Sequence, residues 1–254
     1  MDRRRSPAHQ HAAALSWQLT EQGGTLQLAS QSWPIQLKRS ARRTVGLLIR
    51  DGQLTLQLPQ RYPLHDLTPL LRDKASWLLR HLQTAAEPVP ALQDGGTVEW
   101  LGEPLTLVCL PAAGRSSRVE RDGAHLVVRV PVAAAADALP QAVSRYYRQQ
   151  ALPYLLARLS HFAAMMQRPV PPLSLSSARG RWGSCNRHGE IRLNWRLLQA
   201  PPEVVDYVVC HELAHLLEFN HSPRFWAEVA RLCPSYLHLR SVLKQQGHRW
   251  MRLG

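Results

Sequence analysis

The segment HELAH, at residues 211–215, restricts the fold of this chain more than any other part of the sequence. Residues four apart on an α-helix lie on one face, so His211 and His215 can direct their imidazoles at a single ion. Glu212 would lie beside that ion, where its carboxylate can activate a water. A third histidine, His221, follows six positions after His215. Three neutral nitrogen ligands leave one position open on a tetrahedral Zn²⁺, which is the arrangement of catalytic zinc sites.

Apolar residues surround HELAH on nearly every side of the predicted helix, so we expect this helix to be buried. Two histidines and a glutamate in such a helix are costly unless they are paired or bound to a metal. The helix should begin near Pro201-Pro202 and end near Phe219-Asn220. A left-handed Asn220 would then reverse the chain and bring His221 toward the metal. Ser222-Pro223 predicts the N-cap and first residue of the next helix.

The motif predicts hydrolytic chemistry as well as metal binding. Zinc would lower the pKa of a bound water toward ~7, and Glu212 would act as general base before passing the proton to the leaving group. The alternative third ligand is Glu228, one helix further on. Side chains that can donate to the developing oxyanion are Tyr207, Tyr236 and His238.

At this point the sequence resembles a known family. HELAHLLEFNHSPRFW, together with RGRWGSCNRHGEIRLNWRLL upstream, is similar to the YgjP-like metallopeptidase-domain family and, more distantly, to SprT-like and Wss1-like zinc proteases. The resemblance is close over residues 174–243 and looser over residues 33–131. It implies a zincin-type domain in which the three histidines bind one Zn²⁺ per chain and Glu212 is the catalytic carboxylate. The histidine spacing also matches metzincins, but their glycine between the second and third ligands is Glu218 here, which argues against a metzincin turn.

Composition restricts the partners and the compartment. The net charge of +13 favours anionic partners, although the arginines are spread along the chain and the densest basic cluster is Lys38-Arg39 with Arg42-Arg43. A peptide or protein substrate is the main expectation, with a nucleotide or nucleic acid as the secondary one. No apolar run approaches the ~20 residues that span a bilayer, so we expect no membrane partner. The four cysteines have no CxxC spacing, so we expect no zinc knuckle or redox motif among them. Free thiols in a reducing cytoplasm are the default expectation. The oligomeric state stays open.

Three regions are predicted along the chain. Residues 1–22 are typical of a flexible basic tail. Residues 23–135 form a β-rich N-terminal region with strands at 26–37 and 44–58 around the Asp51-Gly52 turn, one helix from Thr68 to Leu82, and strands at 97–110 and 118–130. Residues 136–254 form the zincin-like metallopeptidase domain, which opens with a helix over 140–166 that Pro153 should kink or split.

The predicted fold class is α+β, with a small antiparallel sheet packed on the HELAH helix. Residues 173–178 and 190–195 supply its strands, and an edge strand of this sheet can pair with an extended peptide. Trp182 and Gly183 are expected to be structural, with Gly183 allowing a close backbone approach. Candidate substrate-binding residues are Arg179, Arg181 and Asn194, the arginines because a guanidinium binds carbonyl, carboxylate or phosphate groups.

Three functions are compatible with these patterns. The first is a cytoplasmic zinc metallopeptidase, which the motif and the resemblance both favour. The second is a zinc-dependent nucleoside triphosphate pyrophosphohydrolase, since the same zinc, water and carboxylate can attack phosphorus. The third is a non-catalytic, zinc-stabilised module associated with nucleic acid. Glu212 argues against this third function, because a structural zinc site needs no such carboxylate and is usually closed by a fourth protein ligand.

Overall fold

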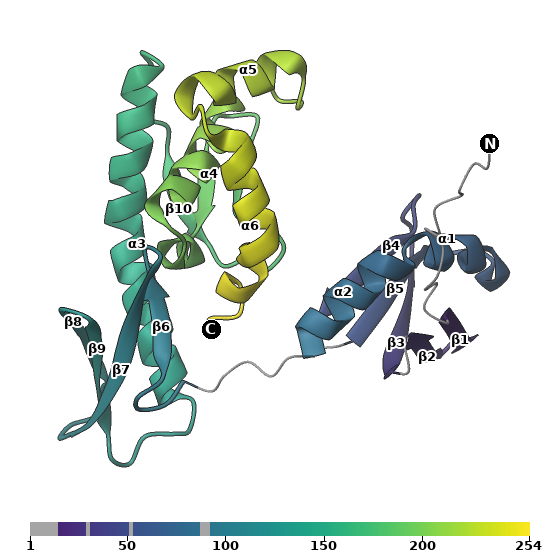
Figure 1. The fold of residues 1–254 in the computed structure, drawn as a ribbon, viewed down its shortest axis with the longest axis horizontal. Helices are drawn as coiled ribbons and strands as arrows, with labels where there is room; N and C mark the ends of the chain where they lie inside the picture. Colours follow the sequence, from purple (N-terminus) through teal and green to yellow (C-terminus); the bar gives the residue numbers. More distant parts are fainter. Residues whose placement is uncertain (1–14, 29–30, 51–52, 87–91) are drawn as a thin grey trace, which may run out of the picture. The chain divides into compact units, whose positions relative to one another are not determined.

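The computed structural model describes residues 15–28, 31–50, 53–86 and 92–254. The chain forms two compact units, Met1–Pro90 and Ala91–Gly254. Each unit contains both helices and sheets, so the fold is mixed α+β (Figure 1). Within the described ranges, none of the helices combines the length and the apolar character needed to cross a bilayer.

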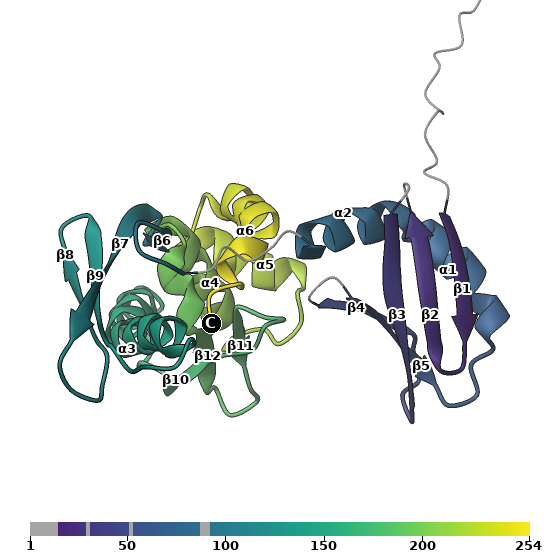
Figure 2. The ribbon, with the colours of Figure 1, turned by 90° about the horizontal axis from the view of Figure 1, so that it is seen from below.

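The first unit is built on a five-stranded sheet with the strand order β1-β2-β3-β5-β4 (Figure 2). Neighbouring strands are antiparallel, except that β3 and β5 run parallel. Leucines of the sheet and of two helices share one core, in which Leu26, Leu56, Leu71 and Leu78 are fully buried. The elements are β1 (Leu15–Thr20), β2 (Gly23–Leu28), β3 (Gln31–Ser40), β4 (Gly46–Arg50), β5 (Gln53–Pro59), the short 3-10 helix η1 (Leu64–Asp66), α1 (Leu67–Asp73) and α2 (Ala75–Ala86).

The first unit corrects three details of the sequence prediction. Part of the expected tail, Leu15–Thr20, is a strand, because alternating Trp17 and Leu19 pack against the core; residues 1–14 lie outside the described residues. The expected single strand over 26–37 belongs to two strands, β2 and β3. The expected single helix is two helices that meet at Lys74. The Asp51-Gly52 turn lies outside the described residues, although its flanking strands β4 and β5 pair antiparallel.

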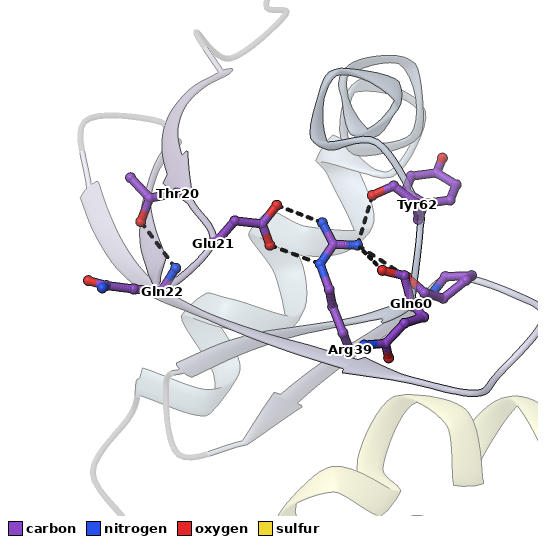
Figure 3. Close-up of polar contacts among 7 residues, drawn as sticks. Thr20, Glu21, Gln22, Arg39, Gln60 and Tyr62 are labelled. Carbon is purple, nitrogen blue, oxygen red and sulfur yellow. Dashed lines mark hydrogen bonds and ion pairs between the residues drawn. The ribbon is translucent and has the colours of Figure 1, made fainter.

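Arg39 links three segments of the first unit (Figure 3). Its guanidinium donates to both carboxylate oxygens of Glu21, each at 2.8 Å. It also donates to the main-chain carbonyls of Pro59, Gln60 and Tyr62 at 3.2, 3.3 and 2.9 Å. The hydrogen bond from Arg39 lowers the pKa of Glu21 below its ordinary value. Arg39, a member of the densest basic cluster of the sequence, therefore joins the β1–β2 turn to the chain at the end of β5.

The second unit begins with a four-stranded sheet of order β6-β7-β9-β8, in which only β7 and β9 are parallel. The strands β2-β3-β5-β4 of the first unit have the same arrangement, in which two antiparallel pairs, β2/β3 and β5/β4, are joined by the parallel strands β3 and β5. Leu107 and Val128 of this sheet share a core with Val143 and Tyr147 of the long helix that follows. The compact units therefore divide at Pro90, whereas the sequence prediction put a boundary at residues 135/136. The elements are β6 (Thr97–Trp100), β7 (Glu103–Ala112), β8 (Arg118–Asp122), β9 (His125–Pro131) and α3 (Ala138–Met165).

A small sheet and three helices complete the second unit. The sheet has the order β10-β12-β11 and is mixed, because β10 runs parallel to β12 while β11 runs antiparallel to it. This corrects the expected antiparallel sheet: the central strand is the last of the three in sequence. Pro153 lies inside α3, which is one continuous helix rather than two. The elements are β10 (Leu173–Ser176), β11 (Gly183–Cys185), β12 (Ile191–Asn194), the 3-10 helix η2 (Trp195–Gln199), α4 (Pro202–Ala214), α5 (Pro223–Leu232) and α6 (Tyr236–Trp250).

Candidate metal centre

Helix α4 carries the first two residues of the candidate site and lies in the middle of the second unit. It lies between α3 and α6 (Figure 1) and contacts α3, α5, α6 and the strands β11 and β12. It begins at Pro202, as predicted, and its valines are buried on several sides of the helix, as the apolar pattern required. The helix ends at Ala214, with His215 as C-cap, rather than near Phe219-Asn220. The chain must leave the helix early for His221 to return to the face that His211 occupies.

The return segment differs in conformation from the sequence prediction. Asn220 is not in the left-handed region, where the described non-glycine residues are only Leu101 and Gln167. Instead its side-chain oxygen accepts a hydrogen bond from the main-chain N–H of Ser222 at 3.1 Å, which closes an Asx turn. Ser222 caps α5 by accepting from the N–H of Phe225 at 3.3 Å, and the predicted Ser222-Pro223 helix start is confirmed.

The three histidines of the motif meet in space. Ring nitrogens of His211, His215 and His221 all lie within 4.8 Å of one another. The Nε2 atoms of His211 and His221 are 3.2 Å apart. The Nδ1 of His215 lies 3.0 Å from the main-chain oxygen of Glu218, which fixes that ring and leaves its Nε2 for another partner. These residues can hold one metal ion.

Electrostatics keep His211 neutral. Burial, followed by the neighbouring His215 and His221 and by Arg240, lowers the pKa of His211 to about 4. Its buried Nδ1 has no hydrogen-bond partner among the described residues. A neutral imidazole is the form that binds a metal. The donor set and its protonation state therefore fit a divalent cation such as Zn²⁺.

Aromatic rings form one wall of the histidine cluster. Phe225 of α5 is fully buried, and its ring centroid lies 4.9, 4.6 and 4.7 Å from those of His211, His215 and His221. The Trp226 ring stacks with that of His221 at 5.7 Å and 27°. Packing against two neighbouring rings limits the rotation of the imidazoles and holds the cluster together.

Glu212 lies next to the cluster and is only 5% exposed. Burial raises the pKa of its carboxyl to about 8, and a nearby cation would oppose this rise by favouring the charged form. The side chain lies against Gly183 of β11: a Cβ added there would meet Oε1 of Glu212 at 2.4 Å. The close backbone approach predicted for Gly183 is confirmed, and its partner, which the sequence did not identify, is Glu212.

The structure separates the three predicted substrate-binding residues. Asn194 is fully buried; it caps η2 and donates to the main-chain oxygens of Ala178 and Arg181 at 2.7 and 3.2 Å. It therefore has no surface to offer a substrate, which corrects the sequence interpretation: the alternating pattern put Asn194 on the polar face, but the end of β12 is covered. Arg179 donates to the main-chain oxygen of Gly254 at 2.6 Å. The side chain of Arg181 is exposed.

The alternative third ligand lies outside the cluster. Glu228 forms an ion pair with Arg231 at 2.6 Å. The group of described residues whose ligand atoms gather for a metal consists of His211, His215 and His221 without it. Arg240 of α6, by contrast, acts electrostatically on His211 although no local pattern of the sequence pointed to it.

Comparison with known proteins gives a family match and two structural likenesses. The sequence model described as YgjP-like, metallopeptidase domain, matches residues 43–246. The metallopeptidase zymogen of Pyrococcus abyssi abylysin has a TM-score of 0.34 and 21% identity, over 37% of this chain and 95% of that one. The metallopeptidase zymogen of Methanocaldococcus jannaschii jannalysin has a TM-score of 0.31 and 16% identity, over 36% and 96%. A search of curated protein sequences gave no match.

Proposed function

This chain belongs to the YgjP-like metallopeptidase-domain family, and from that membership we propose that it is a zinc-dependent peptidase. The proposal assigns His211, His215 and His221 as the ligands of one Zn²⁺ and Glu212 as the catalytic carboxylate. The observation that carries it is the convergence of three histidine nitrogens within 4.8 Å, next to a buried glutamate. The family match agrees with the resemblance that the sequence motifs indicated.

Zinc fits this donor set. Three neutral imidazoles leave a tetrahedral ion one open position, as catalytic zinc sites require. When bound, zinc supplies Lewis-acid chemistry, which polarises a carbonyl oxygen and makes water a stronger nucleophile. The contact between the His215 Nδ1 and the Glu218 carbonyl would hold that ring in the tautomer that presents Nε2.

Glu212 supplies the proton transfers in this proposal. Its carboxylate would accept a proton from the attacking water and then donate it to the nitrogen of the leaving group. A buried carboxylate is a stronger base than an exposed one, because burial disfavours its charged form. The main chain of Gly183 and the walls of the site keep this carboxylate in one place.

Strand β11 supports binding of an extended peptide. It lies at one end of the sheet order β10-β12-β11, and among the described strands it pairs only with β12. Its other edge therefore offers main-chain groups with which a peptide can form hydrogen bonds. Because Gly183 belongs to β11 and touches Glu212, such a peptide would lie next to the catalytic carboxylate. From this arrangement of an edge strand beside the helix α4, we propose that the domain is zincin-like.

The test combines metal analysis with turnover. We expect the purified full-length protein to contain about one zinc per chain, as a three-histidine site predicts, and His211→Ala to lose it. Glu212→Gln should keep the zinc and lose cleavage of an unfolded protein such as casein, because an amide cannot accept the proton. A Glu212→Gln variant with unchanged cleavage would contradict the catalytic assignment. Hydrolysis of nucleoside triphosphates without any peptide cleavage would replace the peptidase by a nucleotide hydrolase.

A further inference from the structure

Arg240 of α6 lies at the edge of the histidine cluster. Its guanidinium carbon is 4.8 Å from the centroid of the Trp226 ring. That ring lies 5.7 Å from His221 and 5.8 Å from His211, measured between ring centroids. One aromatic side chain thus separates a permanent positive charge from two of the three proposed zinc ligands.

The charge of Arg240 is available to a ligand. The side chain is exposed, and it forms no ion pair with any described residue. Two other arginines of α5 and α6 differ in this respect, since Arg231 is paired with Glu228 and Arg249 with Glu99. A guanidinium that lies over an indole ring can still use its N–H groups to bind a carboxylate in a bidentate manner.

Two tyrosines pack against rings of the cluster next to this charge. Tyr236, one turn before Arg240 on α6, stacks on Trp226 at 5.5 Å and 19°. Tyr207, one turn before His211 on α4, has its ring 6.1 Å from that histidine. The exposed guanidinium and the half-buried Tyr236 thus lie on the same indole ring, an arrangement suited to binding an anion.

We propose that Arg240 binds a carboxylate of the peptide substrate beside the zinc site and thereby sets the specificity of cleavage. The inference rests on the proposed peptidase function and deepens it by naming the substrate class. The carboxylate is either the free C-terminus of a short peptide or the side chain of an aspartate or glutamate near the scissile bond. Both present the same planar pair of oxygens to the guanidinium.

The experiment uses the zinc-loaded full-length protein and matched peptide sets. One set compares a free C-terminus with its amide, and the other replaces each acidic side chain by its amide, one position at a time. The variants are Arg240→Gln, which removes the charge, and Arg240→Lys, which keeps the charge but loses the planar fork. Arg145→Gln, at an exposed position of α3, is the control for losing one positive charge from the second unit.

We expect the wild-type enzyme to prefer the carboxylate peptide by roughly two- to fivefold in kcat/KM, as for an exposed charge pair. Arg240→Gln should abolish that preference through KM, while zinc content stays at the wild-type level. Arg240→Lys should keep part of the preference, and Arg145→Gln all of it. The peptide set that responds identifies the source of the carboxylate.

Three results would overturn the assignment. The first is an Arg240→Gln variant with the wild-type preference. The second is an equal loss on carboxylate and amide peptides, or a loss of zinc, because either would mean that Arg240 only supports Trp226 and the histidines. The third is Arg240-dependent hydrolysis of nucleoside triphosphates with no carboxylate preference among peptides. If the zinc-loaded wild type cleaved no peptide of either set, the peptidase proposal itself would fail, which is a different result from uniform cleavage without preference.

Discussion

Replacing Gly183 with alanine tests whether β11 fixes the position of the Glu212 carboxylate. A Cβ atom at this position would lie 2.4 Å from Oε1 of Glu212 and 2.6 Å from its Cδ and Cγ. Ordinary van der Waals contact begins near 3.4 Å, so the end of the Glu212 side chain must move by roughly 1 Å. The strand cannot easily retreat instead, because Gly183 is paired with Leu193 of β12.

The expected loss is larger in turnover than in stability. Forcing a side chain off its preferred rotamer costs about 0.5–1.5 kcal/mol, so the free energy of unfolding should fall by about 1 kcal/mol. A catalytic group misplaced by about 1 Å lowers the rate roughly 100-fold, which corresponds to about 2.7 kcal/mol of transition-state stabilisation. The zinc content should not change, because the atoms that an added Cβ would approach most closely belong to Glu212 and not to a histidine.

The assay compares kcat/KM on a peptide substrate, the urea midpoint and the zinc content for the wild type, Gly183→Ala and Gly180→Ala. Gly180 is the matched control, since a Cβ added there would meet nothing within 4 Å. We expect Gly180→Ala to behave as the wild type. Unchanged kcat/KM in a zinc-loaded Gly183→Ala variant would refute the reasoning, as would an equal loss in both variants.

Asn194→Ala should lower the free energy of unfolding by about 2–4 kcal/mol, because the carbonyls of Ala178 and Arg181 lose a buried donor and η2 loses its cap. Urea titration measures this change, with Arg192→Ala at an exposed position of β12 as the control. A loss no larger than that of the control would contradict the prediction. Arg39→Gln should raise the pKa of Glu21 toward its ordinary value, because the hydrogen bond from Arg39 is the main cause that lowers it. Because the pKa of Glu21 is lowered in the folded state, the pair stabilises the fold at neutral pH, and this contribution is lost as the pH falls through the folded-state pKa. An NMR titration of the Glu21 carboxyl measures the pKa in both proteins, and the same pKa in the wild type and in Arg39→Gln would contradict the contact. Chelation of the metal should lower Tm by roughly 5–10 °C if the site is normally saturated near 100-fold over Kd, whereas in scanning calorimetry His211→Ala should not respond to the chelator.

The sequence contained enough information to predict the parts of the site that depend on local rules. Spacing of four residues places His211 and His215 on one face of any helix, so their approach needed no knowledge of the tertiary structure. Pro202 and Ser222 predict helix starts by local rules, since proline is favoured in the first turn and serine as N-cap. Both helix starts are confirmed. The convergence of His221 could be expected from the motif, but the route of the chain could not.

The parts that could not be predicted depend on contacts between distant segments. The apolar residues after His215 continue a helical pattern, yet the helix ends at Ala214 because His221 packs against Phe225 and His211. The alternating pattern of β12 predicted an exposed Asn194, but this side chain is fully buried and donates to the main-chain oxygens of Ala178 and Arg181, which lie 16 and 13 positions earlier in the sequence. Gly183 packs against Glu212, which lies 29 positions later in the sequence, and no periodic pattern predicts such a contact.

Within the part of the chain that the structure describes, two buried groups at the candidate metal centre lack the partners that burial normally requires. The Nδ1 of His211 is buried without a partner among the described residues, and Glu212 is a buried carboxyl whose pKa is raised by burial alone. Such groups destabilise a fold by about 1–3 kcal/mol each when nothing satisfies them. A sequence under selection for stability alone would fill these positions with apolar residues, as it does at Leu213 and Val209 of the same helix. Departures from local consistency are expected where function requires them, and a cation bound by the histidines would favour the charged form of the buried carboxylate next to them.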